Sequence, residues 1–178
     1  MTTANKITIV RILLVPVFMV FMLSDAPVYI TAVIFLIAAS TDGLDGYVAR
    51  KYRQVTTFGK FIDPLADKLL VTAALLGLVW LQKLSPWLAL IIISREFIVT
   101  SLRIIAISCG KVIPAAFSGK VKTLLQIIAI IAMLSDKLYV IKIGPVHLSG
   151  ILMGAAVIAT LYSGFEYIIK NRALLRQE

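Results

Sequence analysis

Six long runs of apolar residues, separated by short polar segments, make up most of this 178-residue chain. They span residues 7–24, 27–41, 61–82, 86–108, 124–141 and 146–169. A helix of about 20 apolar residues crosses the hydrocarbon core of a bilayer, and it satisfies its backbone hydrogen bonds internally. The pattern therefore predicts an all-α fold, a polytopic membrane bundle of six transmembrane helices. With no sign of a separate soluble segment, we expect a single membrane domain over residues 1–178.

The composition agrees with a membrane protein. Apolar residues make up 60% of the chain, and the mean hydropathy is +0.98. Both values lie far outside the range of soluble globular domains. Cys109 is the only cysteine, so no disulfide can form within the chain.

The distribution of positive charge predicts the topology. The net charge is +9, and with the N-terminus inside, all but three of the 18 basic residues fall on the cytoplasmic side. The exceptions are Lys83, Lys137 and Lys142. Basic residues are enriched on the cytoplasmic side of membrane proteins and attract anionic lipid. We therefore expect both termini to be cytoplasmic in a bacterial-type cell membrane. No long solvated basic segment exists, so we expect no nucleic-acid partner.

Four aspartates lie where the second and third apolar runs meet. Asp42 and Asp45 are three residues apart, and Asp63 and Asp67 are four apart. On helices each pair shares one face. The second run reaches spanning length only if its helix continues through Asp42 to Arg50, which brings all four carboxylates to the cytoplasmic ends of these two helices. Pro64 would then lie near the start of the third helix, where its missing N–H does no harm.

Carboxylates at this depth predict a metal site. Charged groups beside a bilayer are costly and mark functional sites, and four carboxylates without a cation would repel one another. An all-oxygen cage suits a hard divalent cation, Mg²⁺ or Mn²⁺, as one or two ions. The alternative is a structural ion-pair cluster with nearby Arg50, Lys51, Lys60 and Lys68. Ion pairing between these aspartates and the basic residues would not require glycine at positions 46 and 59.

The spacing of these residues resembles the signature of the CDP-alcohol phosphotransferase family. The motif Asp-x2-Asp-Gly-x2-Ala-Arg-x8-Gly-x3-Asp-x3-Asp is filled without departure over 26 positions. Its residues are Asp42, Asp45, Gly46, Ala49, Arg50, Gly59, Asp63 and Asp67. Family members transfer a phosphatidyl or related group from a CDP-linked donor to an alcohol and release CMP. The resemblance implies that the four aspartates surround the metal and that Asp67 is the catalytic base. Related enzymes are dimers, which implies a homodimer here.

A donor site is implied by the same resemblance. Phosphoryl transfer between anions needs cations that neutralise the developing charge. Gly46 and Gly59 would let a pyrophosphate or cytosine approach the backbone closely, and Arg50 offers a fork of donors. Asn5, Thr8 and Arg11 resemble a polar trio that lines the donor side in one branch of the family. The implied donor residues are Asn5, Thr8, Gly46, Ala49, Arg50 and Gly59, and the implied donor is CDP-diacylglycerol.

A second group of charges predicts the acceptor site. Arg95 and Arg103 lie in the fourth apolar run, and Lys120 and Lys122 open the fifth helix. A cationic pocket near a metal site suits an alcohol that carries its own phosphate. The strings Arg-Glu-Phe-x5-Arg and Gly-Lys-x-Lys-Thr resemble a branch of the family whose acceptor is sn-glycerol 3-phosphate. In the alternative interpretation, Lys120 and Lys122 lie at the membrane surface and do not bind the acceptor.

Two other functions stay open on the sequence. A sister enzyme of the family could use serine, inositol phosphate or another alcohol, because the aspartate motif serves the shared donor chemistry. A cation-coupled transporter would also place ionisable residues in membrane helices. Transporter sites lie near the bilayer midplane at broken helices, whereas these carboxylates are predicted at one leaflet.

Overall fold

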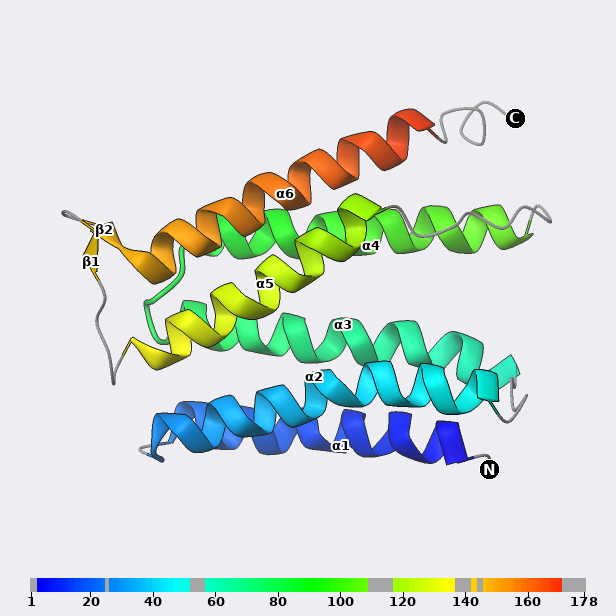
Figure 1. The fold of residues 1–178 in the computed structure, drawn as a ribbon, viewed down its shortest axis with the longest axis horizontal. Coiled ribbons are helices and arrows are strands. Elements are labelled where there is room, and N and C mark those ends of the chain that lie inside the picture. Colours follow the sequence, from blue (N-terminus) through cyan, green and yellow to red (C-terminus); the bar gives the residue numbers. More distant parts are fainter. Residues whose placement is uncertain are drawn as a thin grey trace. The chain divides into compact units, whose positions relative to one another are not determined.

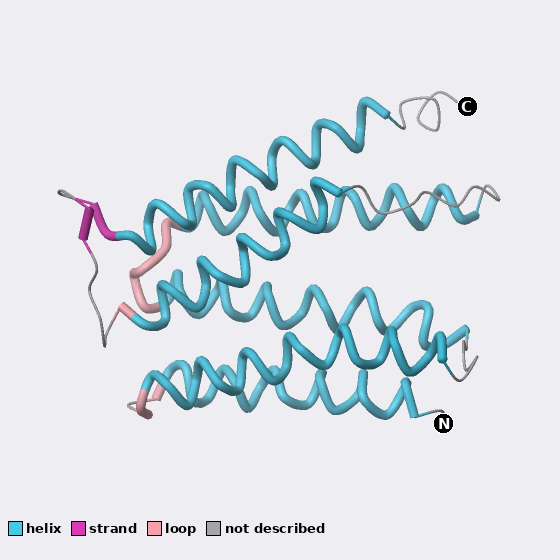
Figure 2. The backbone as a smooth tube through the Cα atoms, in the orientation of Figure 1, coloured by secondary structure: helices cyan, strands magenta, loops and turns pink. Residues whose placement is uncertain are grey.

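A computed structural model describes residues 3–24, 26–51, 57–108, 117–136, 142–143 and 146–170. Within these ranges, side chains are described except at residues 3–6, 42–51, 57–64, 67, 107–108 and 142–146. The described part contains six long helices and two strands of two residues each (Figures 1 and 2). It divides into two compact units, Met1–Lys83 and Leu84–Glu178. The predicted all-helical architecture of six helices is confirmed for these residues, apart from the short strands.

The first unit is a three-helix arrangement. It contains α1 (Thr3–Leu23), α2 (Val28–Lys51) and α3 (Thr57–Trp80), and α1 contacts both of the others (Figure 1). Phe18 of α1 and Phe35 of α2 are fully buried, with ring centroids 5.6 Å apart. At Gly77 of α3, Met22 of α1 lies so close that an ideal Cβ would be 2.5 Å from its Sδ. Glycine at 77 therefore leaves room for the end of the Met22 side chain between α1 and α3.

The boundaries of α2 and α3 test two expectations from the sequence. The helix α2 runs to Lys51, so the second apolar run does continue through the acidic motif as predicted. The helix α3 begins at Thr57, seven residues before Pro64. Pro64, which we expected near the start of the third helix, is therefore its eighth residue and lies beyond the first turn, because the helix begins before the apolar run that starts at residue 61.

The second unit is built around the last helix. It contains α4 (Pro86–Ser108), α5 (Phe117–Ser135), the strands β1 (Lys142–Ile143) and β2 (Val146–His147), and α6 (Leu148–Lys170). The helix α6 contacts both α4 and α5, and the antiparallel hairpin leads directly into it (Figure 2). Ser149 at the start of α6 donates a hydrogen bond to Asp136, just after α5. This contact fixes one end of the α5–α6 pair.

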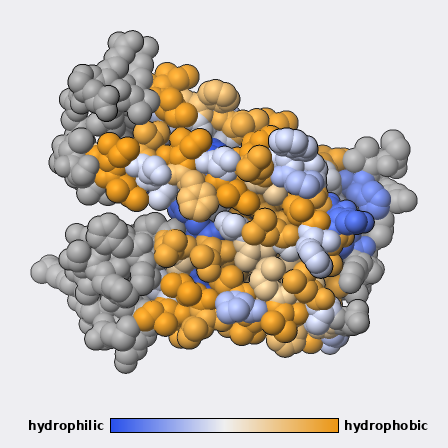
Figure 3. Space-filling model, turned by 180° about the vertical axis from the view of Figure 1, so that it is seen from behind, coloured by the Kyte–Doolittle hydropathy of each residue, from blue (hydrophilic) through white to orange (hydrophobic). Residues whose placement is uncertain are grey.

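Both units bury polar side chains and expose apolar ones. Arg11, Thr8 and Thr160 are fully buried, whereas Leu13 and Ile158 are 63% and 70% exposed. On the face drawn in Figure 3, hydrophobic residues cover most of the coloured surface. Soluble monomers rarely expose apolar patches of this extent. An apolar surface of this extent, over a core that includes buried polar side chains, is typical of a protein surrounded by lipid.

Helix lengths agree in part with the predicted spans. Among the described residues, α5 and α6 are long and apolar enough to cross a membrane. Shorter apolar helical segments occur at Ile7–Leu23, Val28–Thr41 and Lys68–Trp80. These features indicate a membrane protein, and the prediction of six spans stays a prediction.

Candidate functional site

The acidic motif lies at the end of α2 and the beginning of α3. The backbones of Asp42 and Asp45 belong to the last turns of α2, and those of Asp63 and Asp67 to the first three turns of α3. The side chains of all four lie outside the described residues, as do those of Gly46, Ala49, Arg50 and Gly59 in the same motif. The metal site and most of the donor site therefore stay predictions. Of the two helices that carry them, α2 extends through the motif as expected, and α3 begins earlier than the hydropathy pattern indicated.

A buried arginine joins α1 to α2 immediately before this motif. Arg11 is fully buried, and its Nε donates a hydrogen bond of 3.0 Å to Oγ1 of Thr41. Thr41 donates its own proton to the carbonyl of Ala38, at 2.6 Å. The hydroxyl thus receives one hydrogen bond and donates its single proton in another. Arg11 is held beside the residue that precedes Asp42.

The other two members of the predicted polar trio lie on the same helix. Thr8, one turn before Arg11, is fully buried. Asn5 belongs to α1, but its side chain lies outside the described residues. Residues three apart share a helix face, so α1 presents Thr8 and Arg11 together toward the interior of the first unit.

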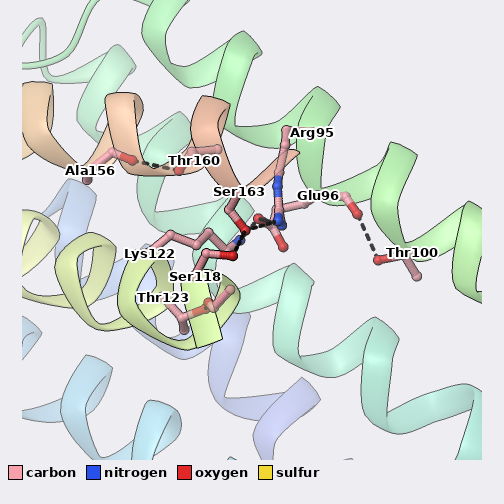
Figure 4. A network of polar contacts seen from close by, with 10 residues as sticks. Arg95, Glu96, Thr100, Ser118, Lys122, Thr123, Ala156, Thr160 and Ser163 are labelled. Carbon is pink, nitrogen blue, oxygen red and sulfur yellow. Dashed lines mark hydrogen bonds and ion pairs between the residues drawn. The ribbon is translucent and has the colours of Figure 1, made fainter. Parts of the chain in front are cut away.

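A polar cluster connects the three helices of the second unit (Figure 4). We call it the Arg95 cluster, and its members are Arg95, Glu96, Ser118, Lys122 and Ser163. Arg95 of α4 donates from Nη1 to Oε1 of Glu96 at 3.2 Å and from Nη2 to Oγ of Ser163 on α6 at 2.7 Å. Lys122 of α5 forms an ion pair with the same Glu96 oxygen. One carboxylate therefore receives two cations from two different helices.

The charges of this cluster are well removed from solvent. Lys122 as a residue is only 3% exposed, and the side chains of Arg95 and Glu96 are 11% and 19% exposed. Burying an ion pair costs desolvation energy that the mutual attraction rarely exceeds, so such pairs are weak evidence for a purely stabilising role. The cluster carries two cations against one anion. That excess of positive charge suits an anionic ligand.

A second acid lies next to the cluster on α6. Ser118 Oγ donates to Oε2 of Glu166 at 2.5 Å and lies 3.3 Å from Ser163 Oγ. Glu166 also accepts a hydrogen bond from Lys170, one turn later, at 2.5 Å. The serine hydroxyls thus link the start of α5 to the last turns of α6.

The four predicted acceptor residues fall into three environments. Arg95 and Lys122 meet at Glu96, as described above. Arg103 places its guanidinium 5.8 Å from the ring centre of Tyr167 on α6, and its buried Nε has no hydrogen-bond partner among the described residues. Lys120 is exposed. Two residues apart on a helix differ by about 200° in direction, which explains why Lys120 and Lys122 point to different surroundings.

An apolar cavity of about 370 Å³ lies between α4 and α6. Arg95 lines it together with Gly164, and the other lining residues are apolar except Ser94. An ideal Cβ at Gly164 would lie 3.0 Å from Arg95 Cγ and 3.6 Å from its Nε. The side chain of Arg95 therefore lies flat against the backbone of α6 at this glycine.

Sequence reasoning did not single out Ser118, Ser163, Gly164 or Glu166. The only signal available was the presence of Ser163, Gly164 and Glu166 within an otherwise apolar run. Ionisable residues in such runs are functional candidates by default, and this rule would have selected Glu166.

Comparison with known proteins agrees with the motif. The family model described as CDP-alcohol phosphatidyltransferase matches residues 1–162. A Bacillus subtilis (strain 168) protein named CDP-diacylglycerol–glycerol-3-phosphate 3-phosphatidyltransferase is 43% identical over 186 residues, covering 97% of this chain and 96% of its own length. A Haemophilus influenzae protein of the same name is 38% identical, covering 91% of this chain and 89% of its own.

A Mycobacterium tuberculosis (strain H37Rv) protein named probable phosphatidylglycerophosphate synthase is also similar. It is 38% identical over 174 residues, which cover 94% of this chain and 80% of its own length. The family match and these near full-length relatives agree with the unbroken aspartate motif of α2 and α3, and the chain belongs to the CDP-alcohol phosphatidyltransferase family.

Proposed function

We propose that this protein transfers the phosphatidyl group of CDP-diacylglycerol to sn-glycerol 3-phosphate, giving phosphatidylglycerophosphate and CMP. The relatives named above carry this activity in their names and align with nearly the whole chain. The observation that supports the choice of acceptor is the Arg95 cluster, in which buried Lys122 and largely buried Arg95 share one carboxylate. An acceptor bearing a phosphate would balance the remaining positive charge, whereas a neutral or zwitterionic acceptor would not.

In this proposal the aspartate motif serves the donor and the reacting groups. Asp67 accepts the proton of the acceptor hydroxyl, whose oxygen attacks the phosphorus of the phosphatidyl group. The bond from that phosphorus to the oxygen of CMP breaks, and CMP leaves with the electron pair. Asn5, Thr8, Gly46, Ala49, Arg50 and Gly59 bind the CDP part of the donor.

A divalent cation fits the chemistry of the donor set. Carboxylates paired at helical spacing on two successive helices supply only oxygen ligands, which Mg²⁺ and Mn²⁺ prefer. Asp42, Asp45, Asp63 and Asp67 would hold one or two such ions. When bound, the cation neutralises charge that develops on the phosphate oxygens.

The acceptor phosphate is assigned to the second group of cations. Arg95 and Lys122 are the principal contacts, and Arg103 and Lys120 complete the predicted set. The arginine offers a planar fork of N–H donors, and the lysine a compact charge with three donors. Together they select an acceptor with a tetrahedral anion.

The remaining features of the proposal concern the membrane. We infer a single domain of six transmembrane helices in a bacterial-type cell membrane, with both termini and the active site on the cytoplasmic side and anionic lipid at the surface. The distribution of basic residues supports the orientation. We also infer a homodimer, on the resemblance to related enzymes.

The test is CMP release by the purified protein in detergent or lipid. We expect release only when a divalent cation, CDP-diacylglycerol and sn-glycerol 3-phosphate are all present. Serine, inositol phosphate and glycerol, supplied one at a time, distinguish the sister activities. Folded protein that releases CMP with serine but not with sn-glycerol 3-phosphate would overturn the choice of acceptor.

A transporter is tested in the same preparation. Liposomes that show cation-coupled uptake of a solute, with no turnover of CDP-diacylglycerol, would contradict the enzymatic function altogether.

A further inference from the structure

We propose that Ser163 and Gly164 of α6 are positioning residues that orient the Arg95 guanidinium for the phosphate of the acceptor. We call these two residues the α6 seat. This inference rests on the proposed function, because it takes the Arg95 cluster as the site of the acceptor's phosphate. It adds to the proposed acceptor site two residues that belong neither to the aspartate motif nor to the predicted group of cations.

The first observation is the hydrogen bond that directs the guanidinium. Ser163 is 1% exposed, and its Oγ accepts from Arg95 Nη2 at 2.7 Å. Glu96 accepts from Nη1 of the same group at 3.2 Å. Two acceptors on different helices fix the plane of the guanidinium, which matters because a planar fork binds a phosphate only when its N–H groups face it.

The second observation is the contact with Gly164. The stem of Arg95 lies where a side chain at residue 164 would be, with Cγ 3.0 Å from the ideal Cβ position. Gly150 and Gly154 lie on the same helix and have nothing within 4 Å of their ideal Cβ positions. The close approach is therefore specific to residue 164 and is not a general property of the glycines of α6.

The third observation is that Ser163 is itself held in place. Its Oγ lies 3.3 Å from Ser118 Oγ, and Ser118 lies 2.5 Å from Glu166. A serine has a single proton to donate, and the shorter contact assigns the proton of Ser118 to the Glu166 carboxylate. Ser163 can then give its own proton to Ser118 while it accepts from Arg95. The orientation of the Ser163 hydroxyl is therefore set by its contacts with Arg95 and Ser118, and through Ser118 by Glu166.

The geometry also predicts what a larger residue at position 164 would do to Arg95. Arg95 and Gly164 both line the cavity between α4 and α6, so the arginine stem has open space into which it can move. A methyl group at residue 164 would push the stem toward this cavity and tilt the guanidinium without opening the helix packing. A misplacement of 1 Å can cost about 10²-fold in rate, and a displacement of a few tenths of an ångström costs less.

The experiment compares matched pairs of variants in the CMP-release assay. Gly164→Ala is compared with Gly154→Ala, and Ser163→Ala with Ser149→Ala, a buried serine at the other end of α6. We expect Gly164→Ala to raise the KM for sn-glycerol 3-phosphate at least about fivefold, and Ser163→Ala to raise it about tenfold. The KM for CDP-diacylglycerol should stay within about twofold in both. Gly154→Ala and Ser149→Ala should leave both constants near the wild-type values.

Inorganic phosphate provides a second readout of orientation. As a competitor of the acceptor, it should inhibit Gly164→Ala and Ser163→Ala more weakly than wild type, by the same factors as the KM changes. Thermal unfolding of all four variants checks the fold, and Ser163→Ala keeps the test decisive if Gly164→Ala does not fold.

The possible outcomes separate the two proposals. A wild-type enzyme that uses sn-glycerol 3-phosphate, together with unchanged acceptor KM in both seat variants, would overturn the seat alone. Equal losses in Gly164→Ala and Gly154→Ala, or a rise confined to the donor KM, would also overturn it. A wild-type protein without acceptor-dependent CMP release contradicts the proposed function instead.

Discussion

Arg11 and Thr41 join α1 to α2 through a hydrogen bond of 3.0 Å, one residue before the acidic motif begins. The guanidinium is fully buried, so the threonine hydroxyl is part of what compensates its charge. A hydrogen bond to a charged group contributes about 1.5–3 kcal/mol, and a lost partner leaves the buried group unsatisfied.

The first prediction is that Arg11 and Thr41 are energetically coupled. Thr41→Val keeps the shape but removes the acceptor, and we expect it to lower the free energy of unfolding by about 1–3 kcal/mol. The double variant Arg11→Met with Thr41→Val should lose less unfolding free energy than the two single variants lose together. The reason is that Thr41→Val alone has already removed the contact. Unfolding in detergent, followed through a double-mutant cycle, measures the coupling. Strictly additive effects would show that the contact is not formed.

The second prediction concerns the proposed base. Asp67→Asn keeps the size of the side chain but cannot take a proton, so we expect kcat to fall at least about 10²-fold while the KM for the donor changes little. Asp136→Asn is the matched control, because Asp136 bonds Ser149 within the second unit and does not belong to the motif. If Asp67→Asn keeps most of the wild-type kcat, Asp67 is not the catalytic base.

The third prediction contrasts the two lysines at the start of α5. Lys122→Met removes a buried cation that is paired with Glu96, and the acceptor KM should rise about 10- to 150-fold. Lys120→Met removes an exposed charge, so its effect should be smaller and should weaken as salt is added. Measuring both constants at low and high ionic strength separates the two. Effects of equal size and equal salt dependence would mean that the burial of Lys122 has no bearing on binding.

The fourth prediction tests the packing of α1 against α3. Gly77→Val should destabilise the protein by about 1–3 kcal/mol, because the new side chain overlaps the position of Met22. Met22→Ala should restore part of that loss by making room. Thermal unfolding of the single and double variants gives the answer, with Gly154→Val as a control where no neighbour lies within 4 Å. If the double variant is less stable than Gly77→Val alone, the close contact between Met22 and residue 77 is not what destabilises Gly77→Val.

The sequence predicted features that depend on local pattern. Extension of α2 to Lys51 followed from the shortness of its apolar run and the helical spacing of Asp42 and Asp45. Arg95 and Lys122 stood out as charges in apolar surroundings, and the structure brings them together at Glu96.

Features that depend on contacts between distant residues could not be predicted. Ser163 lies 68 positions after Arg95, and no spacing rule relates them. The different surroundings of Lys120 and Lys122 depend on which face of α5 meets its neighbours. The antiparallel pairing of β1 with β2 was also not predicted, because β1 lay in the expected connection before the last helix and β2 at the start of the last apolar run.

The dependence of Arg95 on the last helix has a consequence for synthesis of the protein. When α4 leaves the ribosome, Arg95 already has Glu96 beside it, but Lys122 and Ser163 have not yet been made. The guanidinium of a nascent chain therefore has its local counterion alone, and the contacts from α5 and α6 follow in turn. On the proposed assignment of the acceptor phosphate to the Arg95 cluster, recognition becomes possible only when translation has passed Gly164, and a prematurely terminated chain that keeps the whole aspartate motif lacks a competent phosphate site.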